Sequence, residues 1–333
     1  MTDTRTRRRM WGARSRLGLA VAALALFGLA GCGDPVAPVT VTPVVLPDLP
    51  RLPPAPPPVA DVARSDASIA LSQHYQRLQA QLLSQGLLRG DGGGPDTPFT
   101  DSMLARNFIN IALYDEYVTA NGAIRQQATV STLRRWDQPI GMNVEFGRTI
   151  PAAQRSRDTA SIGTFAARLS RLTGVSISQS DQASANFLVL VLNEDDRLGY
   201  ESRLRALVPG IAESSVRAFM DLPRSTLCLV IAFSDGGGPG YGRAVALIRG
   251  EHPDPLRLAC VHEELAQGMG LANDSPAARP SIFNDDEEFG LLTTHDELLL
   301  RMLYDSRFRT GMSAAEAAPI ARQIATELVG GPA

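Results

Sequence analysis

The chain contains no lysine, so arginine and histidine supply all of its basic side chains. Schiff-base chemistry and the P-loop phosphate site both require a lysine, and both are therefore excluded. The sequence also lacks a Gly-x-Ser-x-Gly motif, which presents the nucleophilic serine of many hydrolases.

Cysteine is scarce, and the first of the three cysteines, Cys32, follows a distinctive N-terminus. Residues 1–16 carry six arginines and one acid, and residues 17–31 are uncharged and apolar or small, which is the pattern of a secretory signal. As a helix the apolar stretch would reach only about 22 Å, short of a hydrocarbon core of about 30 Å. The sequence from Leu29 to Cys32 resembles the bacterial lipobox, which implies cleavage before Cys32 and lipidation of its thiol.

Proline is concentrated directly after Cys32, with ten prolines in residues 35–58. Such a segment favours extended polyproline II and cannot form a helix or a central strand. We therefore expect a tether between the lipid and a folded part. The protein is expected in the cell envelope, bound to a membrane through its lipid anchor, with the soluble domain extracytoplasmic (periplasmic).

Negative charge dominates the chain after the signal, because residues 1–31 remove six arginines and one aspartate and leave 26 basic against 34 acidic residues. This balance argues against nucleic acid as a partner. Cys228 and Cys260 remain as an even pair, which an oxidising compartment favours as a disulfide. The alternative is two buried thiols.

The hydrophobic periodicity predicts helices and strands in alternation, which is typical of an α+β or mixed α/β domain. Helices are expected near residues 68–88, 101–119, 161–173, 198–220, 254–269, 294–304 and 313–329, with a weaker one at 122–133. Strands are expected at 139–146, 186–192, 226–233 and 243–249. Ser313 and Glu316 form the pattern of a capping box at the start of the last helix.

The most informative motif lies in residues 260–274, where His262 is followed by Glu263 and Glu264. A zinc HExxH motif fails here, because Ala266 occupies the position of the second histidine. Shifted by one residue, the stretch Glu263-Glu264-x-x-Gln267-x-x-Gly270-x-x-Asn273 has the spacing of the longer metzincin signature. The resemblance implies that Glu264 is the general base and that Glu263, Gln267 and Asn273 hold the metal-ligand positions.

Downstream segments extend the resemblance to the metzincin (zincin-like) peptidases. Residues 280–284 are similar to the Met-turn, with Phe283 at the methionine position, and residues 292–304 resemble the C-terminal helix of that clan. Residues 65–312 also resemble an uncharacterised proteobacterial lipoprotein family, a domain of unknown function with HEELxQ, GLxND and PSIFNDD stretches. The implied fold is an α+β, metzincin-like mixed sheet with an active-site helix, preceded by a helical N-terminal segment.

This gives an expected division into a signal (1–31), a lipidated cysteine with a proline-rich linker (32–64), a helical segment (65–135), a metzincin-like domain (136–312) and a C-terminal helix and tail (313–333). Amide oxygens are weak zinc ligands, so a site without metal, a catalytic zinc and a structural calcium all stay open. His262 with a neighbouring Glu could also act as an acid/base pair. Two functions follow as hypotheses. One is the binding of a peptide, a cell-wall component or a protein partner by a degenerate metzincin-like domain; the other is a metal-dependent peptidase or amidase with Glu264 as base.

Overall fold

The computed structural model describes residues 62–120, 123–234, 238–284 and 286–330. The expected signal, Cys32 and nearly all of the linker lie outside these residues. The described residues belong to one compact unit. Among the residues described, no helix is both long and apolar enough to cross a membrane.

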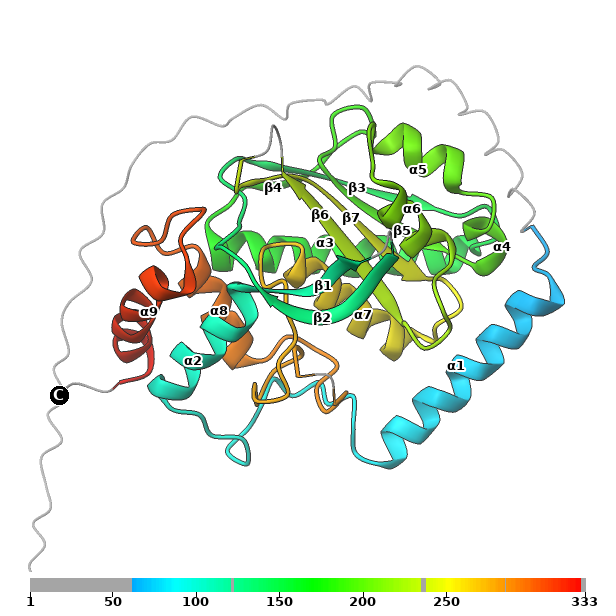
Figure 1. The fold of residues 1–333 in the computed structure, drawn as a ribbon. Coiled ribbons are helices and arrows are strands. Elements are labelled where there is room, and N and C mark those ends of the chain that lie inside the picture. The colour runs from blue at the N-terminus through cyan, green and yellow to red at the C-terminus, as the bar shows by residue number, and fades with distance from the viewer. Residues whose placement is uncertain (1–61, 121–122, 235–237, 285, 331–333) are drawn as a thin grey trace, which may run out of the picture. The chain divides into compact units, whose positions relative to one another are not determined.

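A five-stranded mixed sheet forms the centre of this unit, with the strand order β4-β3-β5-β7-β6. β3, β4, β5 and β7 are mutually parallel, whereas β6 pairs antiparallel with β7 at one edge. The sheet and the surrounding helices confirm the predicted mixed α+β architecture (Figure 1). The strands are β3 (Ile140–Phe146), β4 (Ile177–Gln179), β5 (Phe187–Leu192), β6 (Cys228–Ser234) and β7 (Tyr241–Arg249).

Both faces of the sheet are covered, which explains why β5 is buried along its whole length. Alternate β5 side chains enter two different cores, because successive side chains of a strand point to opposite faces. One core includes side chains of α3 (Ala152–Thr173) and α7 (Asp254–Gln267), and the other includes side chains of α5 (Glu201–Leu207) and α6 (Glu213–Met220). The short helix α4 (Glu194–Arg197) follows β5. Helix α7 therefore lies against the sheet.

The segment before the sheet differs from the helical prediction. Helix α2 (Asp101–Ala112) is shorter than expected, and β1 (Tyr114–Ala120) and β2 (Ala123–Val130) form an antiparallel hairpin where helix was predicted. The physical reason is visible in the sequence, because Asn121-Gly122 separates two runs that contain Tyr, Val, Ile and Thr. The hairpin crosses in front of β6 (Figure 1).

The remaining helices each begin with a capping side chain at the first turn. Ser65 caps α1 (Asp66–Ser84), whose Tyr75 donates to the carbonyl of Arg224. Capping boxes begin α8 (Thr294–Leu303) and α9 (Ala314–Val329), and the second confirms the predicted pair Ser313 and Glu316. Helix α9 packs against α2.

Candidate functional site

An acidic pocket of about 170 Å³ lies between α7, the edge strand β6 and the β1–β2 hairpin. Five of its side chains are carboxylates, and none of the described residues that line it is basic. The lining residues are Glu116, Tyr117, Gln126, Ser225, Thr226, Leu227, Cys228, Leu229, Val230, Glu263, Glu264, Gln267, Asp274 and Glu287.

The end of α7 places three of the predicted residues in this pocket. Glu263 and Glu264 are adjacent on the helix, and Gln267 lies one turn after Glu263. The Gln267 side chain donates to Asp274 Oδ1 at 3.2 Å, across the turn that follows the helix. Gly270 allows this turn, because its φ is +122° and a Cβ there would lie 2.3 Å from the carbonyl oxygen of Arg134. The sequence motif thus becomes one wall of the pocket.

Glu264 is the most deeply buried carboxylate of the pocket, with 4 % of its surface exposed. Its Oε2 atom has no hydrogen-bond partner among the described residues. Burial raises its pKa well above 4.5, and the charges of Glu116 and Asp274 add to the effect. Burial and the charge of Glu264 likewise raise the pKa of Glu263. Carboxylates in this arrangement hold protons more tightly than exposed ones, and a cation that enters the pocket would favour their charged form.

The hairpin contributes polar groups that face the helix. Gln126 donates to Glu116 Oε1 at 3.2 Å. Burial and the neighbouring Glu116 raise the pKa of Tyr117, so its hydroxyl stays protonated. These residues could not be assigned from the sequence motif, because they reach the pocket only through tertiary packing.

A disulfide links two elements that border the pocket. Cys228 on β6 and Cys260 on α7 are joined, as predicted, with 5.8 Å between their Cα atoms. Sγ of Cys228 lies 3.9 Å from Oε2 of Glu263. Because a disulfide sulfur is not a thiolate, Cys228 offers no strong metal ligand.

His262 faces α3 and does not line the acidic pocket. Its ring stacks on Phe165 with 3.9 Å between centroids, and Nδ1 accepts a hydrogen bond from the Leu292 amide at 3.0 Å. Burial and the nearby Arg168 lower its pKa to about 3. The structure therefore does not bring His262 together with Glu264 as an acid/base pair, since residues two positions apart on a helix point in different directions.

Asn273 also stays outside the pocket. Its side-chain amide donates to the carbonyl of Asn110 at 2.7 Å, and its backbone amide donates to the carbonyl of Ile111 at 3.1 Å. These bonds tie the turn after α7 to the end of α2. The next residue, Asp274, lines the pocket instead. Asn273, predicted as the third metal ligand, therefore has a structural role in the turn after α7.

Phe283, at the Met-turn-like position, is fully buried in the larger core. Its carbonyl accepts from the Ser275 amide at 2.7 Å. The turn itself is fixed by Asp296, which accepts from the Ser281 hydroxyl at 2.6 Å and from the Ile282 amide at 3.1 Å. Asp296 is also the N3 residue of the capping box of α8, whose N-cap is Thr293, so the turn and that helix are held together.

The donor atoms in the pocket do not fit a resident metal. Among the described residues, the ligand atoms that converge within 4.8 Å of one another belong to Cys228, Glu263 and Glu264. With the sulfur in a disulfide, two carboxylates remain. Zinc sites use three or four Cys, His or carboxylate ligands, and calcium takes six to eight oxygens.

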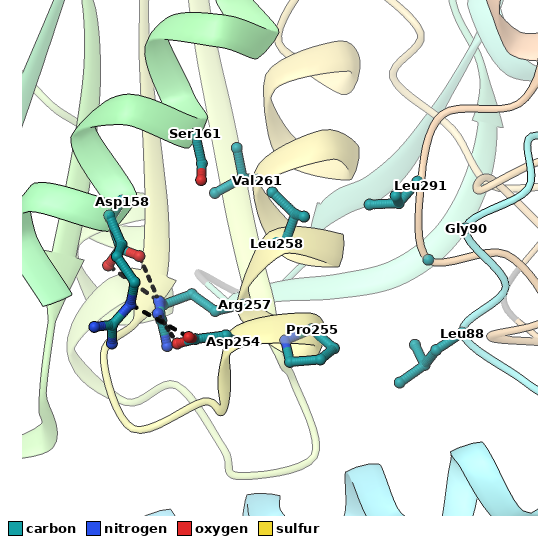
Figure 2. A pocket seen from close by; sticks show the side chains of 12 residues that line it. Leu88, Gly90, Asp158, Ser161, Asp254, Pro255, Arg257, Leu258, Val261 and Leu291 are labelled. Atoms are coloured by element: carbon teal, nitrogen blue, oxygen red, sulfur yellow. Dashed lines mark hydrogen bonds and ion pairs between the residues drawn. The ribbon is translucent and has the colours of Figure 1, made fainter.

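A second hollow, of about 320 Å³, lies between α3, the first half of α7 and two loops (Figure 2). Leu88, Leu258 and Leu291 give it apolar walls. The buried Arg257 is held at its edge by Asp158, with Nε 2.9 Å from Oδ1, and by Asp254. None of the sequence-predicted site residues lines this hollow.

Comparisons with known proteins identify a family without a reaction. No curated protein and no solved structure matches the chain. A family described as "Protein of unknown function (DUF2927)" matches residues 101–323, which include the hairpin, the whole sheet and the acidic pocket but not α1. The chain belongs to this DUF2927 family.

Proposed function

We propose that this protein is a lipid-anchored envelope protein that binds an extended peptide segment, from a partner protein or the cell wall, along β6 beside the acidic pocket. The observation that carries the proposal is the position of β6. It is the last strand of the sheet, and Cys228, Leu229 and Val230 line the pocket opposite α7. In the part of the chain that the structure describes, β6 pairs with β7 alone.

Three hollows that share lining residues lie beside β6. Two further hollows, of about 230 and 360 Å³, share Tyr117 and Leu229 with the acidic pocket. We call the three together the β6 groove. An exposed strand edge offers unpaired backbone groups to an extended peptide, and side pockets then select its alternate side chains.

The envelope location rests on the N-terminal sequence. The basic and apolar signal, the lipobox-like Cys32 and the proline-rich tether are the features that favour it. The Cys228–Cys260 disulfide supports an oxidising compartment. The tether would hold the β6 groove away from the membrane, where a peptide partner can reach it.

The resemblance to metzincins points to the same region, between β6 and α7, as the binding site. The order of strands, with an edge strand shortly before the helix that carries Glu264, agrees with that clan. Peptide binding is favoured over peptidase activity, because Asn273 and Cys228 are engaged elsewhere and the remaining donors do not fit zinc. Hydrolysis is the second candidate, and it is favoured by one observation. Glu264 lines the pocket, and its Oε2 has no hydrogen-bond partner within the described chain, which leaves it uncommitted for the proton transfer that a general base performs.

Binding of an extended peptide can be tested with a peptide library and the full chain in detergent solution. A hit should lose affinity when every second backbone amide is N-methylated, because a β-strand bonds its neighbour through alternate residues. Tyr117→Ala should weaken the hit, whereas Leu198→Ala, which alters a side chain that is 63 % exposed outside the groove, should not. Binding without such alternation would overturn the proposal. Cleavage of the hit, lost in Glu264→Gln, would establish the second candidate instead.

A further inference from the structure

We propose that the acidic pocket holds a positively charged side chain of the bound peptide, an arginine or a lysine. This inference rests on the proposed function, since it names the residue that the β6 groove selects. It is carried by the charge of the pocket, by the unpartnered oxygen of Glu264 and by the poor fit to a metal.

The charge of its lining residues distinguishes the acidic pocket from the other two hollows of the β6 groove. Glu116, Glu263, Glu264, Asp274 and Glu287 all line the pocket, with no basic side chain among its described residues. The two neighbouring hollows each contain one arginine, Arg134 in one and Arg217 in the other, and the Arg134 guanidinium is paired with Asp115 at 2.7 Å. The α7 end of the β6 groove is thus the end that attracts a positive charge.

Burial makes this attraction specific. Glu264 is 4 % exposed, and no described residue gives its Oε2 a hydrogen bond. Buried polar atoms in folded proteins are nearly always hydrogen-bonded, so an orphaned carboxylate oxygen marks a place where a donor is missing. A guanidinium or ammonium group supplies both the donor and the compensating charge.

The geometry suits a side chain better than a metal ion. Oxygens of Glu263 and Glu264 lie within 4.8 Å of one another, which a planar guanidinium can bridge with separate N–H donors. A metal would need further ligands at 2.0–2.6 Å, and the third atom of this group belongs to a disulfide. The volume of about 170 Å³ is several times the roughly 30 Å³ occupied by one liquid water, so a charged head group fits.

The decisive comparison uses a peptide hit in versions that differ at one position, with arginine, lysine, citrulline, norleucine or glutamate there. Affinities for the full chain are measured by fluorescence anisotropy. We expect arginine and lysine to bind at least tenfold more tightly than citrulline, which keeps the shape of arginine without its charge. Glutamate should bind most weakly.

Variants assign the preference to the pocket. Glu264→Gln should reduce the arginine-to-citrulline ratio to near one while the citrulline peptide still binds. Asp274→Asn serves as a second variant if Glu264→Gln does not fold, with circular dichroism checking each protein. Glu213→Gln is the matched control, because Glu213 is exposed, lies outside the pocket and pairs with Arg205.

The outcomes separate this inference from the proposed function. Binding that ignores the charge of the peptide would overturn the inference and leave the peptide groove intact. Failure of every library peptide to bind would overturn the proposed function itself. The last experiment titrates the protein with zinc or calcium alone. Stoichiometric metal binding that is lost in Glu264→Gln would overturn the inference and assign the pocket to an ion instead.

Discussion

Cys228 and Cys260 join the edge strand β6 directly to helix α7, so one disulfide fixes two walls of the acidic pocket relative to each other. The bond lies beside Glu263, within the stretch that carries the motif. It therefore couples the stability of the domain to the geometry of the β6 groove.

Removing this disulfide should lower both stability and binding. The bond closes a loop with a sequence separation of 32, and the chain-entropy estimate for such a loop is about 3–4 kcal/mol. We expect Cys228→Ser/Cys260→Ser to have a free energy of unfolding, measured with urea, that is lower by that amount. The double variant should also bind peptide hits less tightly. Reductant should shift the wild-type midpoint towards that of the double variant and leave the variant unchanged. Equal midpoints for the oxidised wild type and the variant would contradict the prediction.

Glu264 should make the free energy of unfolding decrease as the pH rises. Its folded pKa lies well above the ordinary 4.5, so between those values the folded state binds the proton that the unfolded chain releases. The contribution falls by up to about 1.4 kcal/mol per pH unit in that window. Glu264→Gln should therefore gain stability relative to wild type on going from pH 4 to pH 8, measured by urea unfolding. The exposed Glu213→Gln should show no such gain, because Arg205 holds the pKa of Glu213 below its ordinary value. A constant difference for Glu264→Gln would sink the prediction.

His262 should act in the opposite direction. Its folded pKa of about 3 lies below the ordinary 6.5, so the unfolded chain binds a proton that the folded state excludes. The stability it confers is complete above pH 6.5 and is lost progressively as the pH falls towards 3. His262→Gln should be clearly less stable than wild type at pH 7.5, because stacking on Phe165 is lost, and the deficit should shrink at pH 5. A deficit that grows on acidification would contradict a neutral buried ring.

The sheet and most helices could be predicted because their signals are local. The apolar run of β5 and the helical spacing of α7 lie within one element each. The hairpin escapes the periodicity, because the apolar spacing of residues 122–133 favours a helix, whereas the Asn-Gly pair at its start indicates a hairpin turn. β4 was also missed, since it has three residues and a single half-buried one among them.

The candidate site was predictable only along α7. Spacing placed Glu263, Glu264 and Gln267 on one stretch of helix, and all three line the pocket. Spacing could not show that Asn273 turns towards Asn110, because that depends on how α2 packs. Nor could it bring in Glu116, which is far away in the chain. Motif spacing fixes neighbours on one element, whereas the opposite wall of a pocket depends on tertiary contacts.

The pair Asp158 and Arg257 provides a test of what stabilises α7 on its other side. Both side chains are buried, at 7 % and 4 % exposure, and Arg257 Nε lies 2.9 and 3.0 Å from the two carboxylate oxygens (Figure 2). Burial raises the pKa of Asp158, while Arg257 opposes that effect. Arg257→Met should cost about 3–5 kcal/mol, since it leaves a buried carboxylate without its partner.

Adding Asp158→Asn to Arg257→Met should recover part of that loss, because the buried negative charge is then removed as well. We expect a coupling energy of about 0.5–3 kcal/mol in a double-mutant cycle by urea unfolding. Strict additivity of the two substitutions would contradict a paired role. The same variants, where folded, should keep the arginine-to-citrulline preference of the peptide site, because neither residue lines the acidic pocket. Loss of that preference would place Arg257 in the binding site rather than in the scaffold behind it.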